Sequence, residues 1–171
     1  NPKTRGLFDI SGSRADVGLG DQGVAALATT PDGTLWGGGF EGRLAAFDAR
    51  RGRTRTLTVP NHAAIQVLLS GSDGTLWIGT TGGLCRLARG APSATCPARP
   101  AALSTASIYA LLEEGSRLRV GGSTGLYAYD RVSNKAVPFL RPGARQMFSN
   151  SQVRALLRDR RGRLWVGTEN G

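Results

Sequence analysis

Residues 73–84 read DGTLWIGTTGGL, and two other stretches of the chain are close copies of this one. Residues 32–42 read DGTLWGGGFEG, and residues 161–171 read RGRLWVGTENG. Each copy places leucine and tryptophan before a glycine-rich bend. A repeat with a fixed period of about 20–50 residues indicates a propeller or a solenoid, so these copies decide the fold class.

Alignment of the copies reveals four repeat units. The leucine before the large residue recurs at intervals of 41, 42 and 46 residues, at Leu35, Leu76, Leu118 and Leu164. The next position holds Trp36, Trp77, Arg119 and Trp165. Two residues further along stand Gly38, Gly79, Gly121 and Gly167. Matching apolar segments begin upstream, at Val24, Ile65, Ile108 and Val153. Because four independent columns agree, chance is a poor explanation.

Each unit contains the signals of four short strands. The apolar runs VAALA, IQVLL and VRALL have the length of a buried strand. Asp32-Gly33 and Asp73-Gly74 are expected to supply positive-φ residues for a tight hairpin turn. Two further strands follow, such as LAAFDA and TRTLTV in the first unit. Four antiparallel strands in about 40 residues make a propeller blade, and we expect almost no helix.

The pattern V-x-A-L-x-x-D-x-x-G-x-L-W-[IV]-G-T-x-x-G-[GL] resembles the two-component regulator propeller repeat. In that family, propellers form the periplasmic sensor regions of hybrid histidine kinases and of some diguanylate cyclases. The resemblance covers residues 23–171, and LWIGTTGGL and LWVGTENG carry most of it. The third unit departs from the pattern, because EEGSRLRVGGSTG lacks the Asp-Gly turn and has Arg119 where tryptophan is usual.

The sequence therefore predicts an all-β fold, a β-propeller of about four four-stranded blades. The expected blades are residues 23–63, 64–105, 106–150 and 151–171. Residues 6–18 contain GLFDI, which resembles a third strand and would complete the last blade by closing a ring. The favoured alternative is that residues 1–171 are a piece of a larger propeller. Self-association would then cover the edge strands.

The net charge of +10 comes with 20 arginines among the 22 basic residues, a weak indication of acidic partners. On the expected blades, the turns between strands 1 and 2 and between strands 3 and 4 share one face. Basic residues gather in these turns, at Arg50, Arg51, Arg53, Arg160, Arg161 and Arg163. A solvated rim explains them as well as an acidic partner does. Nucleic acid is disfavoured, because no aromatic residues alternate with these arginines.

Cys85 and Cys96 fall on the expected third and fourth strands of the second blade. Folding that hairpin about residues 89–92 sets the two cysteines opposite each other, near the separation that a disulfide needs. A bridge would agree with an oxidising compartment such as the periplasm, and two free thiols are the equal alternative. Two cysteines and one histidine are too few for a zinc site, so no metal is expected.

The sequence contains no recognisable catalytic arrangement. His62 is the single histidine and has no serine, cysteine or paired carboxylates in a catalytic pattern. The loose carboxylates that could serve an enzyme are Asp16, Asp21, Glu41 and Glu169. The glycine-rich stretches do not lead into helices, so they are not phosphate loops, and no cofactor is expected. The three tryptophans are interpreted as packing between blades rather than as sugar-stacking platforms.

The face opposite the arginines carries the residues we expect to bind a ligand. This face combines hydrogen-bonding groups with an aromatic ring on its longest connection, residues 141–150. The candidate residues are Asn61, His62, Thr81, Thr124, Arg141, Arg145, Gln146, Phe148 and Asn150. A plain connector is the equal alternative, because loop composition is weak evidence.

The resemblance implies a non-catalytic sensor in the periplasm, the extracytoplasmic part of an inner-membrane protein. Its expected ligand is a small molecule, often a saccharide in that family, and its partners are neighbouring propeller or output domains. Membrane contact would come only through segments outside residues 1–171, which have no run of 18 apolar residues. The alternatives are a propeller lyase or glycosidase acting on anionic saccharides, and a generic interaction scaffold.

Overall fold

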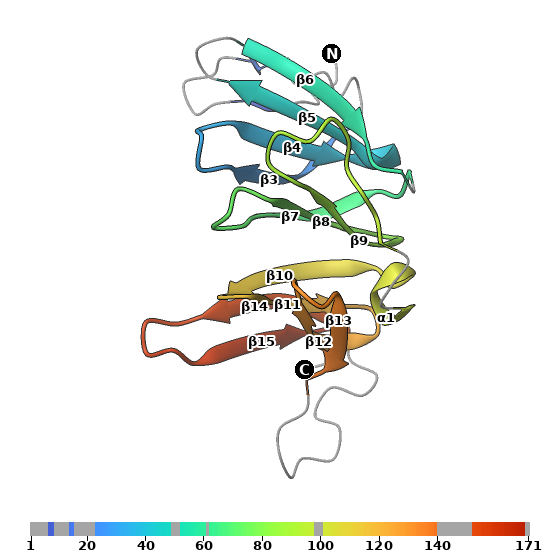
Figure 1. The fold of residues 1–171 in the computed structure, drawn as a ribbon, viewed down its shortest axis with the longest axis vertical. Helices are drawn as coiled ribbons and strands as arrows, with labels where there is room; N and C mark the ends of the chain where they lie inside the picture. The colour runs from blue at the N-terminus through green and yellow to red at the C-terminus, as the bar shows by residue number, and fades with distance from the viewer. Residues whose placement is uncertain are drawn as a thin grey trace.

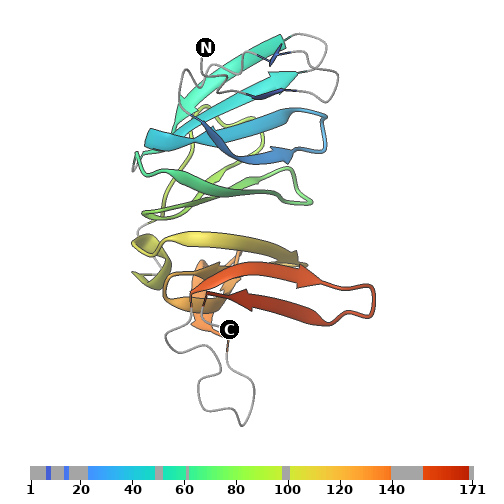
Figure 2. The same cartoon turned by 180° about the vertical axis from the view of Figure 1, so that it is seen from behind.

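The structure is a computed structural model that describes residues 7–8, 14–15, 23–48, 52–60, 62–97, 101–139 and 152–169. Its described strands form antiparallel sheets that lie one after another along the molecule (Figure 1). Figure 2 shows the same row of sheets from behind. The expected all-β propeller fold is confirmed.

Successive sheets follow the four sequence repeats. The first sheet has the order β3 (Val24–Thr29), β4 (Leu35–Gly39), β5 (Arg43–Asp48), β6 (Gly52–Thr58). The second consists of β7 (Ile65–Ser70), β8 (Leu76–Thr80) and β9 (Gly83–Leu87). The third has the order β10 (Ile108–Glu114), β11 (Arg117–Gly122), β12 (Gly125–Asp130), β13 (Lys135–Pro138). The fourth pairs β14 (Val153–Arg158) with β15 (Leu164–Thr168). We call these sheets blades 1 to 4.

Several details differ from the sequence expectations. The fourth strand of blade 2 is reduced to one β-bridge, between Arg86 and Thr95. Blade 3 has all four strands although it lacks the Asp-Gly dipeptide, because a two-residue turn with Gly115 at φ +57° joins β10 to β11. Two short helical segments occur, the 3₁₀ turn η1 (Phe40–Gly42) and the helix α1 (Ala101–Ser104).

The N-terminal hairpin is not hydrogen-bonded into any of the four blades. β1 (Leu7–Phe8) pairs with β2 (Arg14–Ala15) in a two-stranded sheet of their own. Neither strand is hydrogen-bonded to β14 or β15 among the described strands. The closure of the last blade by residues 6–18 of the same chain therefore stays a prediction.

The blades contact one another through their first strands, and glycine makes the close approach possible. A Cβ atom built on Gly38 would lie 2.5 Å from Cγ2 of Ile65, and one on Gly79 would lie 2.8 Å from Cγ2 of Ile108. The equivalent Cβ on Gly121 would lie 2.5 Å from Cγ1 of Val153. Each of these glycines forms a hole for the β-branched residue that begins the next blade.

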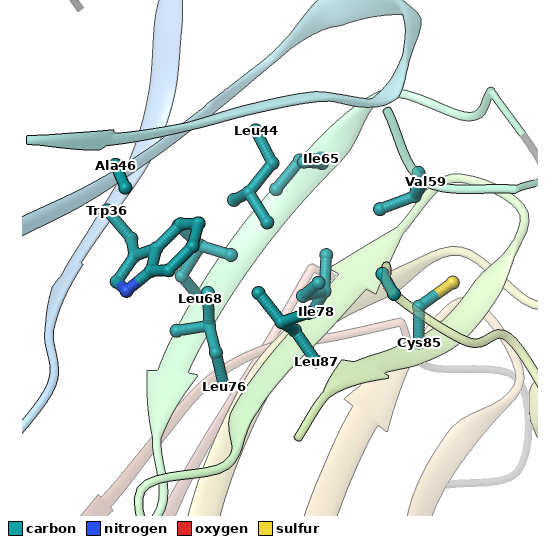
Figure 3. Close-up of a cluster of buried hydrophobic side chains, with 11 residues drawn as sticks. Trp36, Leu44, Ala46, Val59, Ile65, Leu68, Leu76, Ile78, Cys85 and Leu87 are labelled. Atoms are coloured by element: carbon teal, nitrogen blue, oxygen red, sulfur yellow. The ribbon is translucent and has the colours of Figure 1, made fainter. Parts of the chain in front are cut away.

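Apolar clusters fill the spaces between blades. Figure 3 shows the cluster between blades 1 and 2, where Trp36 and Leu44 from blade 1 meet Leu68, Leu76 and Ile78 from blade 2. A second cluster lies between blades 2 and 3 and includes Trp77, Leu111 and Tyr129. The hydrophobic core is thus divided among the blade interfaces, as a repeat architecture requires.

The 1–2 turns of blades 1, 2 and 4 share one geometry. In blade 1, the amide of Gly33 donates to the carbonyl of Thr30, and the amide of Thr30 donates to the carbonyl of Thr34. This is a three-residue loop whose last residue, Gly33, has φ +84°. The expected positive φ belongs to the glycine alone. Asp32 instead stabilises the turn through its side chain, because its Oδ1 accepts a hydrogen bond from the amide of Thr34 over 3.1 Å.

The tryptophan position of the repeat has a different environment in each blade. Trp36 and Trp77 are 8 % and 2 % exposed and lie in the blade interfaces, whereas Trp165 is 53 % exposed. Nε1 of Trp165 donates to Asp159 over 2.9 Å. Nε1 of Trp77 is buried and has no hydrogen-bond partner, because Gly71 stands at the position that Asp159 holds in blade 4.

Candidate ligand-binding cleft

A small concave site lies between blades 1 and 2, on the side of the molecule that carries the 1–2 turns. We call this side the turn face; Figure 1 shows its β3–β4, β7–β8 and β14–β15 turns on the left. The cleft has a volume of about 50 Å³. That is room for a few water molecules, or for one substituent of a larger ligand.

Two neighbouring blades contribute the walls of the cleft. Blade 1 supplies Thr30, Pro31 and Asp32 from its turn, Trp36 from β4 and Arg55 from β6. Blade 2 supplies Gly74, Leu76, Leu87, Ala88, Arg89 and Gly90. The floor is therefore apolar and aromatic, while the rim carries one carboxylate and two guanidinium groups. A hydroxylated or anionic ligand would find both hydrogen-bond donors and acceptors there.

The turn holds Asp32 in its ionised form. The hydroxyl of Thr30 donates to Oδ1 of Asp32 over 2.7 Å, and the amide of Thr34 donates to the same atom. These hydrogen bonds, that of Thr30 first, lower the pKa of Asp32 below its ordinary value. Asp32 therefore presents a fixed negative charge beside the cleft at neutral pH.

Arg55 ties the two blades together at the cleft. Its Nη2 donates to the carbonyl oxygen of Ala91 over 2.7 Å, from β6 of blade 1 to the loop after β9 of blade 2. The disulfide between Cys85 and Cys96 fastens the base of that same loop. The residues opposite Asp32 thus belong to a loop held covalently at one end and by Arg55 at its centre.

A chain of ion pairs continues along the turn face from blade 2 to blade 4. Glu113 of β10 accepts from the amide of Ser72 over 2.9 Å and pairs with Arg131 over 2.7 Å. Arg119 pairs with Glu114 over 2.7 Å, and Glu114 also pairs with Arg158 of blade 4. At the third interface this ionic network takes the place of the tryptophan, which explains how Arg119 fits the repeat.

Guanidinium groups of blades 3 and 4 also stack on aromatic rings. Arg119 lies 4.3 Å from the ring centre of Phe139, and Arg163 lies 5.1 Å from that of Trp165. Asp159 in the blade 4 turn has a lowered pKa, caused first by the Trp165 indole and then by the Arg163 hydrogen bonds. The pairs Arg119–Glu114 and Arg163–Asp159 thus hold charged groups of blades 3 and 4 in place.

The ligand face expected from the sequence lies on the opposite side, at the 2–3 turns and the 4–1 connections. There Thr81, Thr124 and His62 are exposed, and His62 has φ +50°. The carbonyl of Thr81 accepts the Ser107 hydroxyl over 3.2 Å, which joins blade 2 to the start of blade 3. The other expected residues lie outside the described part of the chain, namely Asn61, Arg141, Arg145, Gln146, Phe148 and Asn150. A ligand at this face stays a prediction.

The described residues form neither a metal site nor a membrane-spanning helix. No group of three or more His, Cys, Asp or Glu side chains in those ranges is placed to hold a metal ion. No helix in the same part of the chain is long and apolar enough to cross a membrane.

Comparison with known proteins supports the repeat assignment. Residues 147–170, which include β14 and β15, match the family model described as the two component regulator propeller. A search of curated proteins finds no match. The resemblance seen in the sequence is therefore confirmed at the fourth repeat.

Solved structures support the fold over most of the chain. The extracellular domain of BT4673 from B. thetaiotaomicron, described as a one component system, superposes with a TM-score of 0.73 at 21 % identity and covers 91 % of this chain. That of BT3049, described as a hybrid two component system of the same organism, gives 0.71 at 22 % identity and covers 88 % of this chain. This chain spans only 22 % and 20 % of the lengths of those two extracellular-domain chains.

An enzyme shares the same fold. Virginiamycin B lyase from Staphylococcus aureus, solved with quinupristin, superposes with a TM-score of 0.64 at 17 % identity. The match covers 86 % of this chain and 49 % of the lyase. At such identities these likenesses establish the propeller fold and leave the activity to be argued from the site.

Proposed function

We propose that this chain is a non-catalytic, extracytoplasmic ligand-binding propeller region of a bacterial signal-transduction protein. The cleft between blades 1 and 2 is its ligand site, and a saccharide is its ligand. The observation that carries the proposal is that the cleft takes its polar groups from two different blades. A ligand held there contacts both blades at once.

The groups at the cleft suit a sugar better than an apolar molecule. Asp32 accepts hydrogen bonds, Arg55 and Arg89 donate them, and the indole of Trp36 forms part of the lining. Because the cleft holds about 50 Å³, one hydroxymethyl or carboxylate group enters it and the rest of the ligand lies across the turns. Two guanidinium groups against one carboxylate favour an anionic sugar.

Signalling would follow from the position of the cleft. A ligand that bridges the β3–β4 turn and the loop after β9 favours the arrangement of blades in which both contacts are made. The Arg55–Ala91 hydrogen bond already links β6 of blade 1 to the loop after β9, so the ligand acts beside an existing connection between the two blades. An output domain elsewhere in the protein would respond to the selected arrangement.

The disulfide supports an extracytoplasmic location, since such bonds persist in oxidising compartments. The family match at residues 147–170 supports the regulator class. A fold shared with a lyase is not by itself evidence that this chain is an enzyme, so catalytic turnover by this chain is tested directly.

The proposal is tested by titrating the purified chain with neutral and uronic-acid oligosaccharides in a calorimeter. A member of the uronic-acid set is expected to bind saturably, and Arg55→Gln is expected to weaken it about tenfold or more, the cost of one charge-assisted hydrogen bond. Arg160→Gln is the matched control, because Arg160 is an exposed arginine of the blade 4 turn. Binding that Arg55→Gln and Asp32→Asn leave unchanged would rule out the cleft.

Two further measurements separate the alternatives. Mass spectrometry of the recovered ligand detects cleavage, and a shortened or unsaturated product would establish an enzyme instead of a sensor. An Arg145→Ala, Phe148→Ala double variant tests the face expected from the sequence. If that variant loses binding while Arg55→Gln retains it, the ligand belongs on the opposite face.

A further inference from the structure

Two arginines at the ends of the third strands of blades 2 and 3 occupy the same repeat position. Arg89 and Arg131 each stand two residues after the residue that pairs with the repeat leucine of the second strand. Each lies on the 1–2 turn of its own blade. A Cβ on Gly74 would be 3.0 Å from Cδ of Arg89, and Nη2 of Arg131 donates to the carbonyl of Gly115 over 2.6 Å. The two side chains therefore lie on equivalent parts of neighbouring blades.

Arg131 holds two carboxylates at the interface between blades 2 and 3. Its Nη1 lies 2.7 Å from Oε1 of Glu113 in its own blade and 3.6 Å from Oδ2 of Asp73 in the preceding blade. The Glu113 carboxylate also accepts hydrogen bonds from the amide and the hydroxyl of Ser72, each over 2.9 Å. A carboxylate of the chain is thus bound at this interface by donors from two blades.

The cleft between blades 1 and 2 has the same arginine and aspartate, with a serine in place of the glutamate. Asp32 stands four residues before the tryptophan of its blade, as Asp73 does. Asp32 and Arg89 both line the cleft, and in the described part of the chain they form no ion pair with each other. Ser70 occupies the position of Glu113, because each pairs with the repeat leucine of its second strand. Arg89 therefore lacks the carboxylate partner that its counterpart has in blade 3.

We propose that the ligand of the cleft presents a carboxylate to Arg89, in the position that the Glu113 carboxylate holds beside Arg131. This inference rests on the proposed function, and it names a uronic acid as the sugar class. Arg89 is then the residue that selects the acid over a neutral sugar, because a guanidinium group binds a carboxylate with charge-assisted hydrogen bonds. It also bridges the ligand to Asp32, as its counterpart bridges two carboxylates. The interface between blades 2 and 3 is the same site filled by the protein itself.

The remaining donors differ between the two sites. Pro31 stands at the position of Ser72 and has no amide hydrogen. Blade 1 instead contributes Arg55, which lines the cleft, whereas Thr95 holds the equivalent position of blade 2. One N–H group of Arg55 binds the carbonyl of Ala91, and a guanidinium group carries several. A second guanidinium group therefore replaces the serine donors in the cleft.

Side-chain size explains why one interface is filled and the other is open. Tyr129 of blade 3 packs edge-on against Trp77, with ring centres 5.7 Å apart. The equivalent residue of blade 2 is the smaller Leu87, which lines the cleft together with Trp36. The cleft of about 50 Å³ has room for a carboxylate group.

A glutamate placed at Ser70 tests the assigned position in the free protein. Ser70→Glu should pair with Arg89 and raise the Tm by about 2–4 °C above that of Ser70→Gln, which has the same shape without the charge. The difference should vanish when Arg89→Gln is added to both variants. Equal Tm values for Ser70→Glu and Ser70→Gln, or a difference that survives Arg89→Gln, would overturn the assigned position.

Calorimetric titration tests the ligand class. The uronic-acid oligosaccharides are compared with their methyl esters, which keep the sugar and lose the charge. The unmodified chain should bind the acid at least about tenfold more tightly than the ester. Arg89→Gln should reduce this ratio to about one, whereas the control Arg160→Gln leaves it unchanged. Ser70→Glu should weaken binding of the acid more than about 100-fold, because its own carboxylate occupies the site, while Ser70→Gln still binds.

The outcomes separate this inference from the function on which it rests. If no oligosaccharide binds saturably, both the proposed function and the inference are wrong. If acid and ester bind the unmodified chain equally, or Ser70→Glu binds the acid as tightly as Ser70→Gln does, the inference alone is wrong and a saccharide site remains.

Discussion

Replacing Gly79 with alanine tests whether the glycine holes set the spacing of the blades. The new Cβ would lie 2.5 Å from Cγ1 of Val67 and 2.8 Å from Cγ2 of Ile108. An ordinary contact begins at 3.4 Å, so the nearer atom must move by 3.4 − 2.5 = 0.9 Å. Both neighbours are packed, Val67 in the same blade and Ile108 in the next.

The expected loss of stability follows from that displacement. Forcing a methyl group into a packed core costs about 1–3 kcal/mol. Replacing glycine also removes entropy from the unfolded chain, which returns about 0.4–1 kcal/mol. From the midpoints of these ranges, about 2 and 0.7 kcal/mol, the net change in the free energy of unfolding is a loss of about 1.3 kcal/mol. The Tm should then fall by about 3–5 °C.

Urea denaturation followed by circular dichroism measures the loss, with Gly167→Ala as the control in the same repeat position. The Cβ of that variant would lie 3.3 Å from Cβ of Ala155, so its stability should change by less than about 0.5 kcal/mol. Both are measured at a concentration where the chain is monomeric. Adding Val67→Ala to Gly79→Ala should recover part of the loss, because the closest methyl group is then gone. Equal stability of the Gly79→Ala and Gly167→Ala proteins would refute the reasoning.

Three further predictions concern the covalent link, the turns and the ion pairs. The Cys85→Ser, Cys96→Ser double variant should lose about 3 kcal/mol in urea denaturation, because the bridge closes a loop of sequence separation 11; an unchanged midpoint would contradict this. Hydrogen bonds, first from a threonine hydroxyl, lower the pKa of Asp32 in the folded chain. Its contribution is therefore complete above the unfolded pKa of about 4 and is lost as pH falls through the folded pKa, so Asp32→Asn should flatten the acid limb of stability against pH. Arg131→Met should lower the free energy of unfolding by about 1–3 kcal/mol, measured by thermal melting, because it leaves the largely buried carboxylate of Glu113 without its ion pair. The control Arg117→Met breaks only an exposed pair at 3.8 Å and should cost less than about 0.5 kcal/mol.

The architecture could be read from the sequence because the information is local and repeated. The repeat position of Val24 marks the first strand of each blade, and that of Leu35 marks the second. Strands that are adjacent in the sequence then pair with each other, so these positions predict the sheets. The turn of blade 3 lacks the Asp-Gly dipeptide, but Gly115 has the positive φ that allows the same two strands to form a hairpin. The weak fourth strand of blade 2 was not foreseen, since a single bridge at Thr95 and a disulfide hold that segment in place of a ladder.

The cleft could not be read in the same way. Its residues come from a turn near Asp32, from Arg55 and from the loop at Ala88–Gly90, which only the stacking of two blades brings together. The sequence placed arginines on this face but did not show which of them would be engaged. That depends on side-chain conformation, such as the reach of Arg55 to the Ala91 carbonyl. The opposite face was expected from the length and composition of the connection at residues 141–150, which do not specify how its side chains are arranged.

Tryptophan stands at the same repeat position in three blades, and this has a practical consequence for spectroscopy. The indole N–H of Trp165 donates a hydrogen bond to the carboxylate of Asp159, whereas the indole N–H of Trp77 is buried and has no acceptor. Their nitrogen-bound protons should therefore resonate at well-separated chemical shifts, the first downfield and the second upfield. A two-dimensional ¹⁵N spectrum would then follow individual repeats during titration or heating, without any introduced label on the side chains.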